Sequence, residues 1–262
     1  MVGVEVAGGA HPALCRVCLF NGDPQALRQG LLGPVTPSPL PLSPLPLSPS
    51  GKPGLSAWVW ALAARANGVD LGHHNVFFTA DPADEWGPMA RGTLPERPTL
   101  YVCAQVRGGV APVTGPERFD IIMNGPAHLT GLPNEGTTCR QTILSHLGSH
   151  GLIPTSEPGG ALLSPSRLAQ LYPGSGGAIY GGSPEGALAA FRRPTARTAL
   201  PDLDLAGGGA HPGAGVPMAR LSGRHAAEAI WQDRILPSGF RPAAMAGGRS
   251  TASAPTEPAP YR

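Results

Sequence analysis

A glycine-rich segment between an apolar stretch and a helical one has the clearest potential for chemistry in this sequence. Glycines stand at positions 207, 208, 209, 213 and 215. Leu203, Leu205 and Ala206 before them indicate a short buried strand, and a helix is expected to begin near Pro217 or Met218. Glycine permits close backbone approach and a positive φ angle, and a helix N-terminus offers free N–H groups and partial positive charge. The segment therefore predicts a site for an anionic or electron-rich ligand. A tight turn in which glycine serves packing alone explains the spacing equally well.

Outside the glycine-rich segment, few residues suggest a catalytic or metal-binding site. His211, inside the glycine-rich segment, could move a proton or bond to the backbone of a turn. His73 and His74 stand at the start of an expected strand, and because neighbouring strand residues face opposite ways we predict no shared metal ion. The 262 residues contain neither of the phosphate-binding motifs G-x-G-x-x-G and G-x-x-x-x-G-K-[ST], and no Ser-His-Asp set or paired carboxylates stand out.

The cysteines and the charge limit the class of protein. Cys15 and Cys18 have C-x-x-C spacing but fall on one predicted strand, where residues three apart face opposite ways and a disulfide is geometrically poor. No second such pair completes a zinc site, so we expect reduced thiols. Charged residues make up 14% of the chain, the net charge is +2, and Lys52 is the single lysine. A basic nucleic-acid-binding surface is therefore not expected.

The elements that must position these groups are strands with helices between some of them. Apolar or alternating runs predict strands at 2–6, 14–20, 57–66, 74–79, 99–105, 118–124 and near Leu203. Helices are expected at 24–32 and 165–171, with Asp23 and Ser164 as N-caps, and also at 137–147, 184–192 and after the glycines. The proline-rich stretch 33–56 indicates a linker, and 237–262 a disordered tail. The four strands between 57 and 124 predict an antiparallel or mixed sheet, and the fold class is α/β with a mixed-sheet domain.

Several segments together resemble one enzyme family, the carotenoid (phytoene-type) desaturases. The similar segments are GGGAHPGAGVPMARLSGRHAAEAI (207–230), LFNGDPQALRQGLLG (19–33), AWVWALAARANGVDLGHHNVFFTADPADEW (57–86), LPERPTLYVCAQVR (94–107) and AQLYPGSGGAIYG (169–181). They follow the family's order and resemble in particular its 1-hydroxycarotenoid 3,4-desaturase (methoxyneurosporene dehydrogenase) branch. The resemblance covers roughly residues 2–234 and corresponds to the C-terminal half of such an enzyme, without the N-terminal G-x-G-x-x-G.

The resemblance implies that the chain helps to bind FAD. Backbone N–H groups at the start of the last helix would face the pyrimidine end of the flavin, where partial positive charge stabilises the ring after it accepts a hydride. The implied cofactor-binding residues are Gly207, Gly208, Gly209, Pro212, Gly213, Gly215, Val216 and Pro217. Arg192, Arg193 and Arg197 either contact the phosphate or ribityl part of the cofactor, or they are surface charges or make structural hydrogen bonds. A substrate domain over 57–190 would be flanked by parts of an incomplete Rossmann-like FAD-binding domain at 2–32 and 191–236.

The implied activity is desaturation, in which a hydride passes from a C–C bond of an acyclic hydroxylated carotenoid to the flavin. His211 is the candidate catalytic residue. Aromatic side chains of the sheet could line a tunnel for the lipophilic substrate, with core packing as the alternative. The candidate tunnel residues are Trp58, Trp60, Phe77, Tyr101 and Tyr180.

Three interpretations of the chain stay open. Without the element that holds the adenosine diphosphate half of FAD, the chain could be a truncated enzyme, a non-catalytic remnant, or a half-enzyme that needs a separate N-terminal chain. The first residues have neither the basic nor the apolar region of a signal peptide, and no apolar run reaches the roughly 18 residues of a membrane span. We therefore expect a cytoplasmic protein that meets its apolar substrate at a membrane surface.

Overall fold

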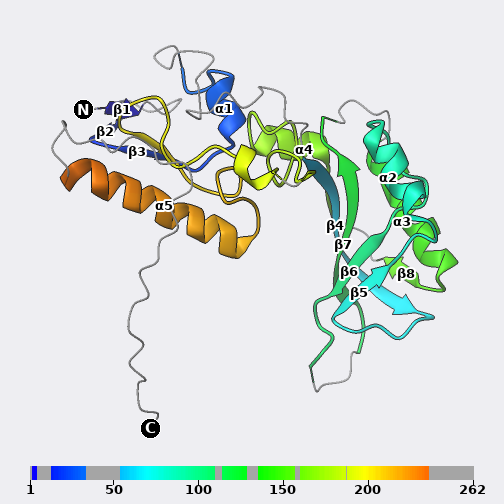
Figure 1. Cartoon of the computed structure of the whole chain (residues 1–262). Helices are drawn as coiled ribbons and strands as arrows, with labels where there is room; N and C mark the ends of the chain where they lie inside the picture. The colour runs from blue at the N-terminus through cyan, green and yellow to red at the C-terminus, as the bar shows by residue number, and fades with distance from the viewer. Residues whose placement is uncertain are drawn as a thin grey trace, which may run out of the picture.

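The computed structural model describes residues 2–4, 13–33, 54–109, 114–128, 135–156, 160–186 and 188–235. These residues form two groups of elements that stand side by side in Figure 1, a sheet unit on the right and a terminal unit on the left. The terminal unit combines segments from both ends of the chain, and the sheet unit contains the residues between them. Most of the predicted linker and all of the predicted tail lie outside the described residues.

The sheet unit is built on a six-stranded sheet in which every pair is antiparallel. The strand order is β5-β6-β7-β4-β8, and β9 pairs with another part of β4. The four strands predicted here from apolar patterns are confirmed, whereas the four-residue strand β8 and the three-residue strand β9 were not predicted. The strands are β4 (Leu55–Asn67), β5 (His74–Phe77), β6 (Leu100–Ala104), β7 (Glu117–Pro126), β8 (Ile153–Ser156) and β9 (Ala161–Leu163).

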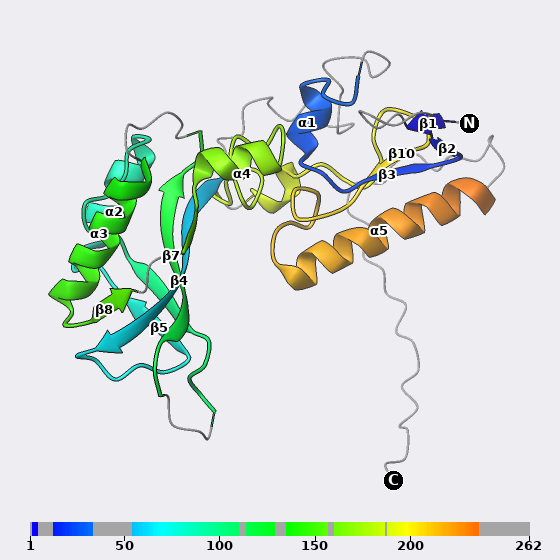
Figure 2. The same ribbon diagram turned by 180° about the vertical axis from the view of Figure 1, so that it is seen from behind.

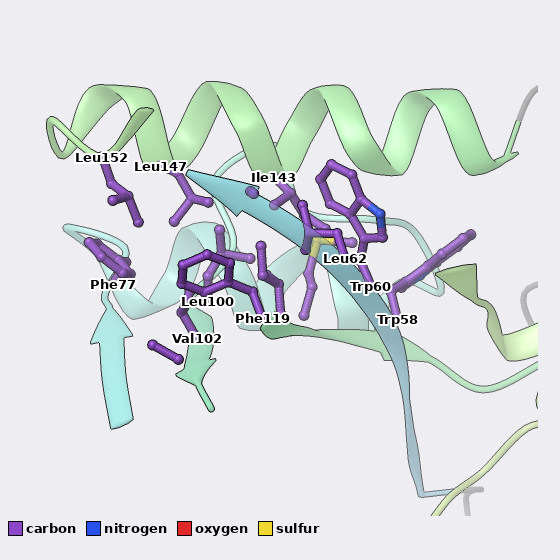
Figure 3. Close-up of a cluster of buried hydrophobic side chains, with 14 of the residues drawn as sticks. Trp58, Trp60, Leu62, Phe77, Leu100, Val102, Phe119, Ile143, Leu147 and Leu152 are labelled. Carbon is purple, nitrogen blue, oxygen red and sulfur yellow. The ribbon is translucent and has the colours of Figure 1, made fainter. Parts of the chain in front are cut away.

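The main core lies between one face of this sheet and helix α3 (Glu135–Ser149). Every second residue of β6, such as Leu100 and Val102, is buried, as the period of a half-buried strand requires. Figure 3 shows Trp60 and Phe119 from the sheet beneath the helix, together with Ile143 and Leu147 of α3 itself. The opposite face of the sheet carries only half-exposed side chains at its centre, which leaves it available to a further layer or ligand.

Two helices of the sheet unit begin at capped prolines. Asp81 and Ser164 each accept a hydrogen bond from a backbone N–H in the first turn of α2 (Pro82–Ala90) and α4 (Pro165–Leu171), as the cap-then-proline pattern predicts. The helix expected at 184–192 is wrong for most of its length. In the described residues it is reduced to one 3-10 turn at Ala190–Arg192, because the prolines and glycines around it interrupt a longer helix.

The terminal unit joins β10 (Leu203–Leu205) to β3 (Cys18–Phe20) in a parallel pair. A second, antiparallel pair consists of β1 (Val2–Val4) and β2 (Ala13–Cys15). The single strand predicted at 14–20 is wrong, because its two halves turn at Arg16 and pair with different partners. Helix α1 (Pro24–Arg28) follows β3 with the predicted Asp23 cap, and α5 (Val216–Ile235) follows β10 and packs against it (Figure 2). In the part of the chain that the structure describes, Cys15, Cys18, Cys103 and Cys139 form no disulfide with one another.

Among the described helices, none combines the length and the apolar character that crossing a bilayer would require.

Candidate functional site

The glycine bend, which we define as residues 207–215, lies between the end of β10 and the start of α5. The three residues of β10 are buried, and the backbone N–H of Gly207 donates to the hydroxyl of buried Ser222 on α5 at 3.1 Å. This hydrogen bond ties the first residue of the bend to the helix that follows it. The strand, the bend and the helix therefore form one compact corner.

The first part of the bend is closed by the chain's own packing. Gly207 has a φ of +112°, and a Cβ there would collide with the side chain of Asn21. A Cβ at Gly209 would lie 2.5 Å from Cδ of Pro24, the first residue of α1. Glycine is thus required at these two positions by the approach of the segment 21–24, which supports the packing explanation of the spacing there.

The last part of the bend is open. Gly215 has a φ of +99° and no atom within 4 Å of an added Cβ. The next residue, Val216, begins α5 and is 86% exposed. The first α-helical bond near this end runs from the Ala219 N–H to the Gly215 carbonyl, and Pro217 has no N–H. The N–H groups of Val216 and Met218 precede this bond, so they lack a helical acceptor. This end of the bend can present backbone donors and a positive dipole end to a ligand.

Arg193 joins the glycine bend to a second glycine-rich loop. Its guanidinium donates to the carbonyl of Gly208 at 2.8 Å and to the carbonyl of Gly182 at 3.2 Å. Burial lowers the pKa of Arg193, although the nearby Asp23 carboxylate acts in the opposite direction. The guanidinium therefore makes structural hydrogen bonds, the alternative considered for this residue, and holds the two loops against each other.

His211 lies within the bend and is half-buried. Its backbone N–H donates to the carbonyl of Pro194 at 2.7 Å. Its ring stacks with those of Phe191 and His225, at centroid distances of 6.3 and 6.1 Å. The neighbouring Pro212 is half-buried, and Gly213 approaches Arg193 so closely that an added Cβ would lie 3.0 Å from its Nε. The histidine ring therefore belongs to an aromatic stack beside the middle of α5.

The candidate tunnel residues do not share one surface. Trp58, Trp60 and Phe77 are at most 8% exposed and belong to the core beneath α3, the packing alternative (Figure 3). Tyr101 is half-buried on the opposite face of the sheet, because it alternates with the core residues of β6. Tyr180 is 50% exposed and stands beside Gly181, whose added Cβ would lie 3.2 Å from Cα of Gly209. The loop of Tyr180 thus adjoins the glycine bend.

Asp204, in the middle of β10, is a titratable residue that the sequence analysis did not single out. Its side chain is 6% exposed. Burial raises the pKa of Asp204 to about 6, the charge of Asp233 adds to the effect, and Arg197 opposes it. The sequence could have identified Asp204, because it is an acidic residue between two leucines of a short strand. A strand that is buried on both faces has no exposed position for a carboxylate.

Three side chains that were not expected to lie together form a cluster at the edge of the sheet. One ring nitrogen from each of His73 and His74 and the sulfur of Cys103 all lie within 4.8 Å of one another. The prediction that the two histidines point apart is wrong, because β5 begins only at His74 and His73 sits in the bend before it. Burial raises the pKa of Tyr101, and a hydrogen bond with Cys103 contributes.

Comparison with known proteins gives a consistent relationship. The chain is 57% identical over 241 residues to a hydroxyneurosporene desaturase of Rhodobacter capsulatus, covering 90% of this chain and 47% of that protein. It is 52% identical to the one of Cereibacter sphaeroides, with 88% and 46% covered, and 40% identical to that of Rubrivivax gelatinosus, with 97% and 49% covered. No known family profile matches the chain.

The chain spans about half the length of these relatives, the extent that the resemblance predicted. At these identities, over nearly its whole length, the chain belongs to the carotenoid desaturase family.

Proposed function

We propose that this chain forms part of an FAD-dependent desaturase that acts on an acyclic hydroxylated carotenoid. The observation that carries the proposal is the 57% identity to a hydroxyneurosporene desaturase over 90% of the chain, which includes the glycine bend. When bound, FAD would supply a hydride acceptor for the conversion of a C–C single bond into a double bond.

The open end of the glycine bend is compatible with a flavin. A ring placed against Gly215 and Val216 would meet no side chain of the bend at Gly215, since this position has open space where a Cβ would project. Backbone donors at the start of α5 would stabilise negative charge on that ring. Gly207, Gly208, Gly209, Pro212, Gly213 and Pro217 would shape the corner, and Arg193 would hold it against the loop of Tyr180. His211 remains the candidate for moving a proton at the edge of the site.

The substrate would lie along the less covered face of the six-stranded sheet. This face carries half-exposed Tyr101 together with Val59 and Ile122, which are its neighbours in the strand register. Tyr180, beside the bend, would stand where the polyene meets the flavin. Trp58, Trp60 and Phe77 would support this face from the core side.

The two structural units would bind different molecules, the substrate and the cofactor. Residues 57–190 would form the substrate domain, and 2–32 with 191–236 would form part of a Rossmann-like FAD-binding domain. The dinucleotide-binding G-x-G-x-x-G would come from the portion of the relatives that this chain does not match, either in a longer protein or in a separate chain. The encounter with an apolar carotenoid would occur at a membrane surface.

Co-expression with the unmatched portion of a hydroxyneurosporene desaturase tests the proposal. We expect flavin absorbance in the purified pair and a red shift of the carotenoid spectrum when hydroxylated neurosporene is supplied. Gly215→Leu, which fills the open position, should remove both signals. Gly92→Leu is the matched control, because Gly92 also combines a positive φ (+76°) with open space but lies after α2. A colourless, inactive pair would instead favour a non-catalytic remnant.

A further inference from the structure

The edge of the six-stranded sheet brings together three side chains that can ligate a transition metal. They are His73 and Cys103, both half-buried, and the exposed His74. Strands β5 and β6 belong to the sheet unit, apart from the α5 helix of the terminal unit in both views (Figures 1 and 2). The cluster is therefore separate from the glycine bend, although its neighbour Tyr101 lies on the sheet face proposed for the substrate.

The spacing of the cluster matches what a metal ion needs. Nε2 of His73 lies 3.7 Å from Sγ of Cys103. In a tetrahedral zinc site, bond lengths of about 2.0–2.1 Å to nitrogen and about 2.3 Å to sulfur place those two ligands about 3.6 Å apart. The separation between His73 and Cys103 already has this value. The third ligand atom, from the exposed His74, lies within 4.8 Å of both, so a small movement of this side chain would bring it to ligand distance.

Hydrogen bonds around the cluster orient the rings as ligands. Nδ1 of His73 is 2.9 Å from the carbonyl of Arg107, so this nitrogen is the donor and Nε2 keeps its lone pair. The hydroxyl of Tyr101 is 2.6 Å from Nδ1 of His74. A histidine whose second nitrogen is fixed by a carbonyl or similar partner is characteristic of metal sites.

The surrounding charge also favours a cation. Asp120 stands opposite Cys103 in the β6–β7 register, on the same face of the sheet. Its carboxylate accepts a hydrogen bond from Gln105 and carries negative charge toward the cluster. The guanidinium of Arg107, whose backbone carbonyl contacts His73, bonds to Glu117 and Asp70 and is neutralised by them.

We propose that His73, His74 and Cys103 bind a thiophilic divalent cation of the Zn²⁺ type. The ion would tie the bend before β5 to strand β6, and a water molecule would complete the coordination. Imidazole and thiolate ligands select zinc-like metals over magnesium or calcium, which prefer oxygen. The proposed site is structural, because it fixes the edge of the sheet and lies away from the bend.

The test uses the whole chain, purified under reducing conditions, freed of metal and titrated with Zn²⁺ and with Co²⁺ as a coloured substitute. We expect one ion per chain and a thiolate-to-cobalt charge-transfer band. Cys103→Ser should abolish the band and weaken Zn²⁺ binding at least about 100-fold, since losing even an outer partner of a ligand costs about 10–100-fold. Exposed His74→Gln, which should leave folding intact, should also weaken binding. Tyr101→Phe should reduce affinity about tenfold.

The double variant Cys15→Ser/Cys18→Ser is the control, because it removes two other half-buried thiols and leaves the cluster unchanged. Circular dichroism checks the fold of every variant. The proposal is overturned if the chain binds neither ion, or if the cobalt band persists in folded Cys103→Ser. It is equally overturned if the band disappears in the control, since the C-x-x-C thiols would then be the ligands.

Discussion

Substitutions at two adjacent glycines of the bend test whether close packing against α1 explains why glycine stands at position 209. In Gly209→Ala the new Cβ would lie 2.5 Å from Cδ of Pro24. Carbon atoms pack best at about 3.5–4.0 Å, so the bend and α1 must separate by about 1 Å. Pro24 is a rigid ring at the start of a helix and cannot rotate away. Overpacking of this kind costs about 1–3 kcal/mol.

Gly208→Ala is the matched control at the neighbouring position. Its Cβ would lie 3.6 Å from Cα of Ala214, an ordinary contact, and its φ is not among the positive values. We expect its free energy of unfolding to be unchanged or raised by up to about 1 kcal/mol, because alanine restricts the unfolded chain.

Urea unfolding in the absence of flavin, followed by circular dichroism, measures both variants. A loss of about 1–3 kcal/mol in Gly209→Ala corresponds to a Tm lower by about 2–12 °C for a chain of this size. The reasoning is refuted if Gly208→Ala is destabilised as much as Gly209→Ala, because the approach of α1 would then not explain the glycine.

Three other perturbations test the core and its charges. Arg107→Ala should lower the free energy of unfolding by about 3–5 kcal/mol, because it leaves the 3% exposed carboxylate of Glu117 without its bidentate partner; Arg97→Ala, which breaks an exposed pair, should cost less than about 1 kcal/mol in the same urea titration. The pKa of Asp204 is raised from 3.8 to about 6, so between these pH values the folded state binds more protons than the unfolded state, and the free energy of unfolding should fall as the pH rises. Asp204→Asn should flatten this part of a Tm-against-pH curve. An unchanged slope would mean that another group causes the pH dependence. Trp58→Ala, at a fully buried position, should cost about 3–5 kcal/mol in thermal unfolding, and a loss below about 1 kcal/mol would argue against its core role.

Local features of the fold could be predicted from the sequence. The caps at Asp23 and Ser164 act on the next few residues, and the apolar run of β4 is decided by burial along one strand. Such features depend on neighbours in the chain, which a pattern contains. The strand at 14–20 was mispredicted for the opposite reason. Its halves are separated by their pairing with β1 and β10, and no property of residues 14–20 specifies those partners.

The same distinction applies to the sites. The glycines at 207 and 209 could be identified from the sequence. The reason that glycine is required there is the close approach of Asn21 and Pro24, which come from the other end of the chain. Cys103 meets the two histidines only because β5 and β6 pair with His74 opposite Cys103. The register of an antiparallel pair connected by a helix and long turns is set by the whole core, so the cluster could not be derived from spacing.

The parallel pairing of β3 with β10 has a consequence for biosynthesis. Cys18 emerges from the ribosome before the sheet unit, whereas its partner Leu203 is made only after the entire sheet unit. Until then the edge of β3 exposes unpaired N–H and C=O groups, which other chains can capture. The intervening sheet, whose strand pairs are nearer in sequence, can form first and bring the two ends together. Slowed translation between β9 and β10 should therefore increase aggregation of the nascent protein.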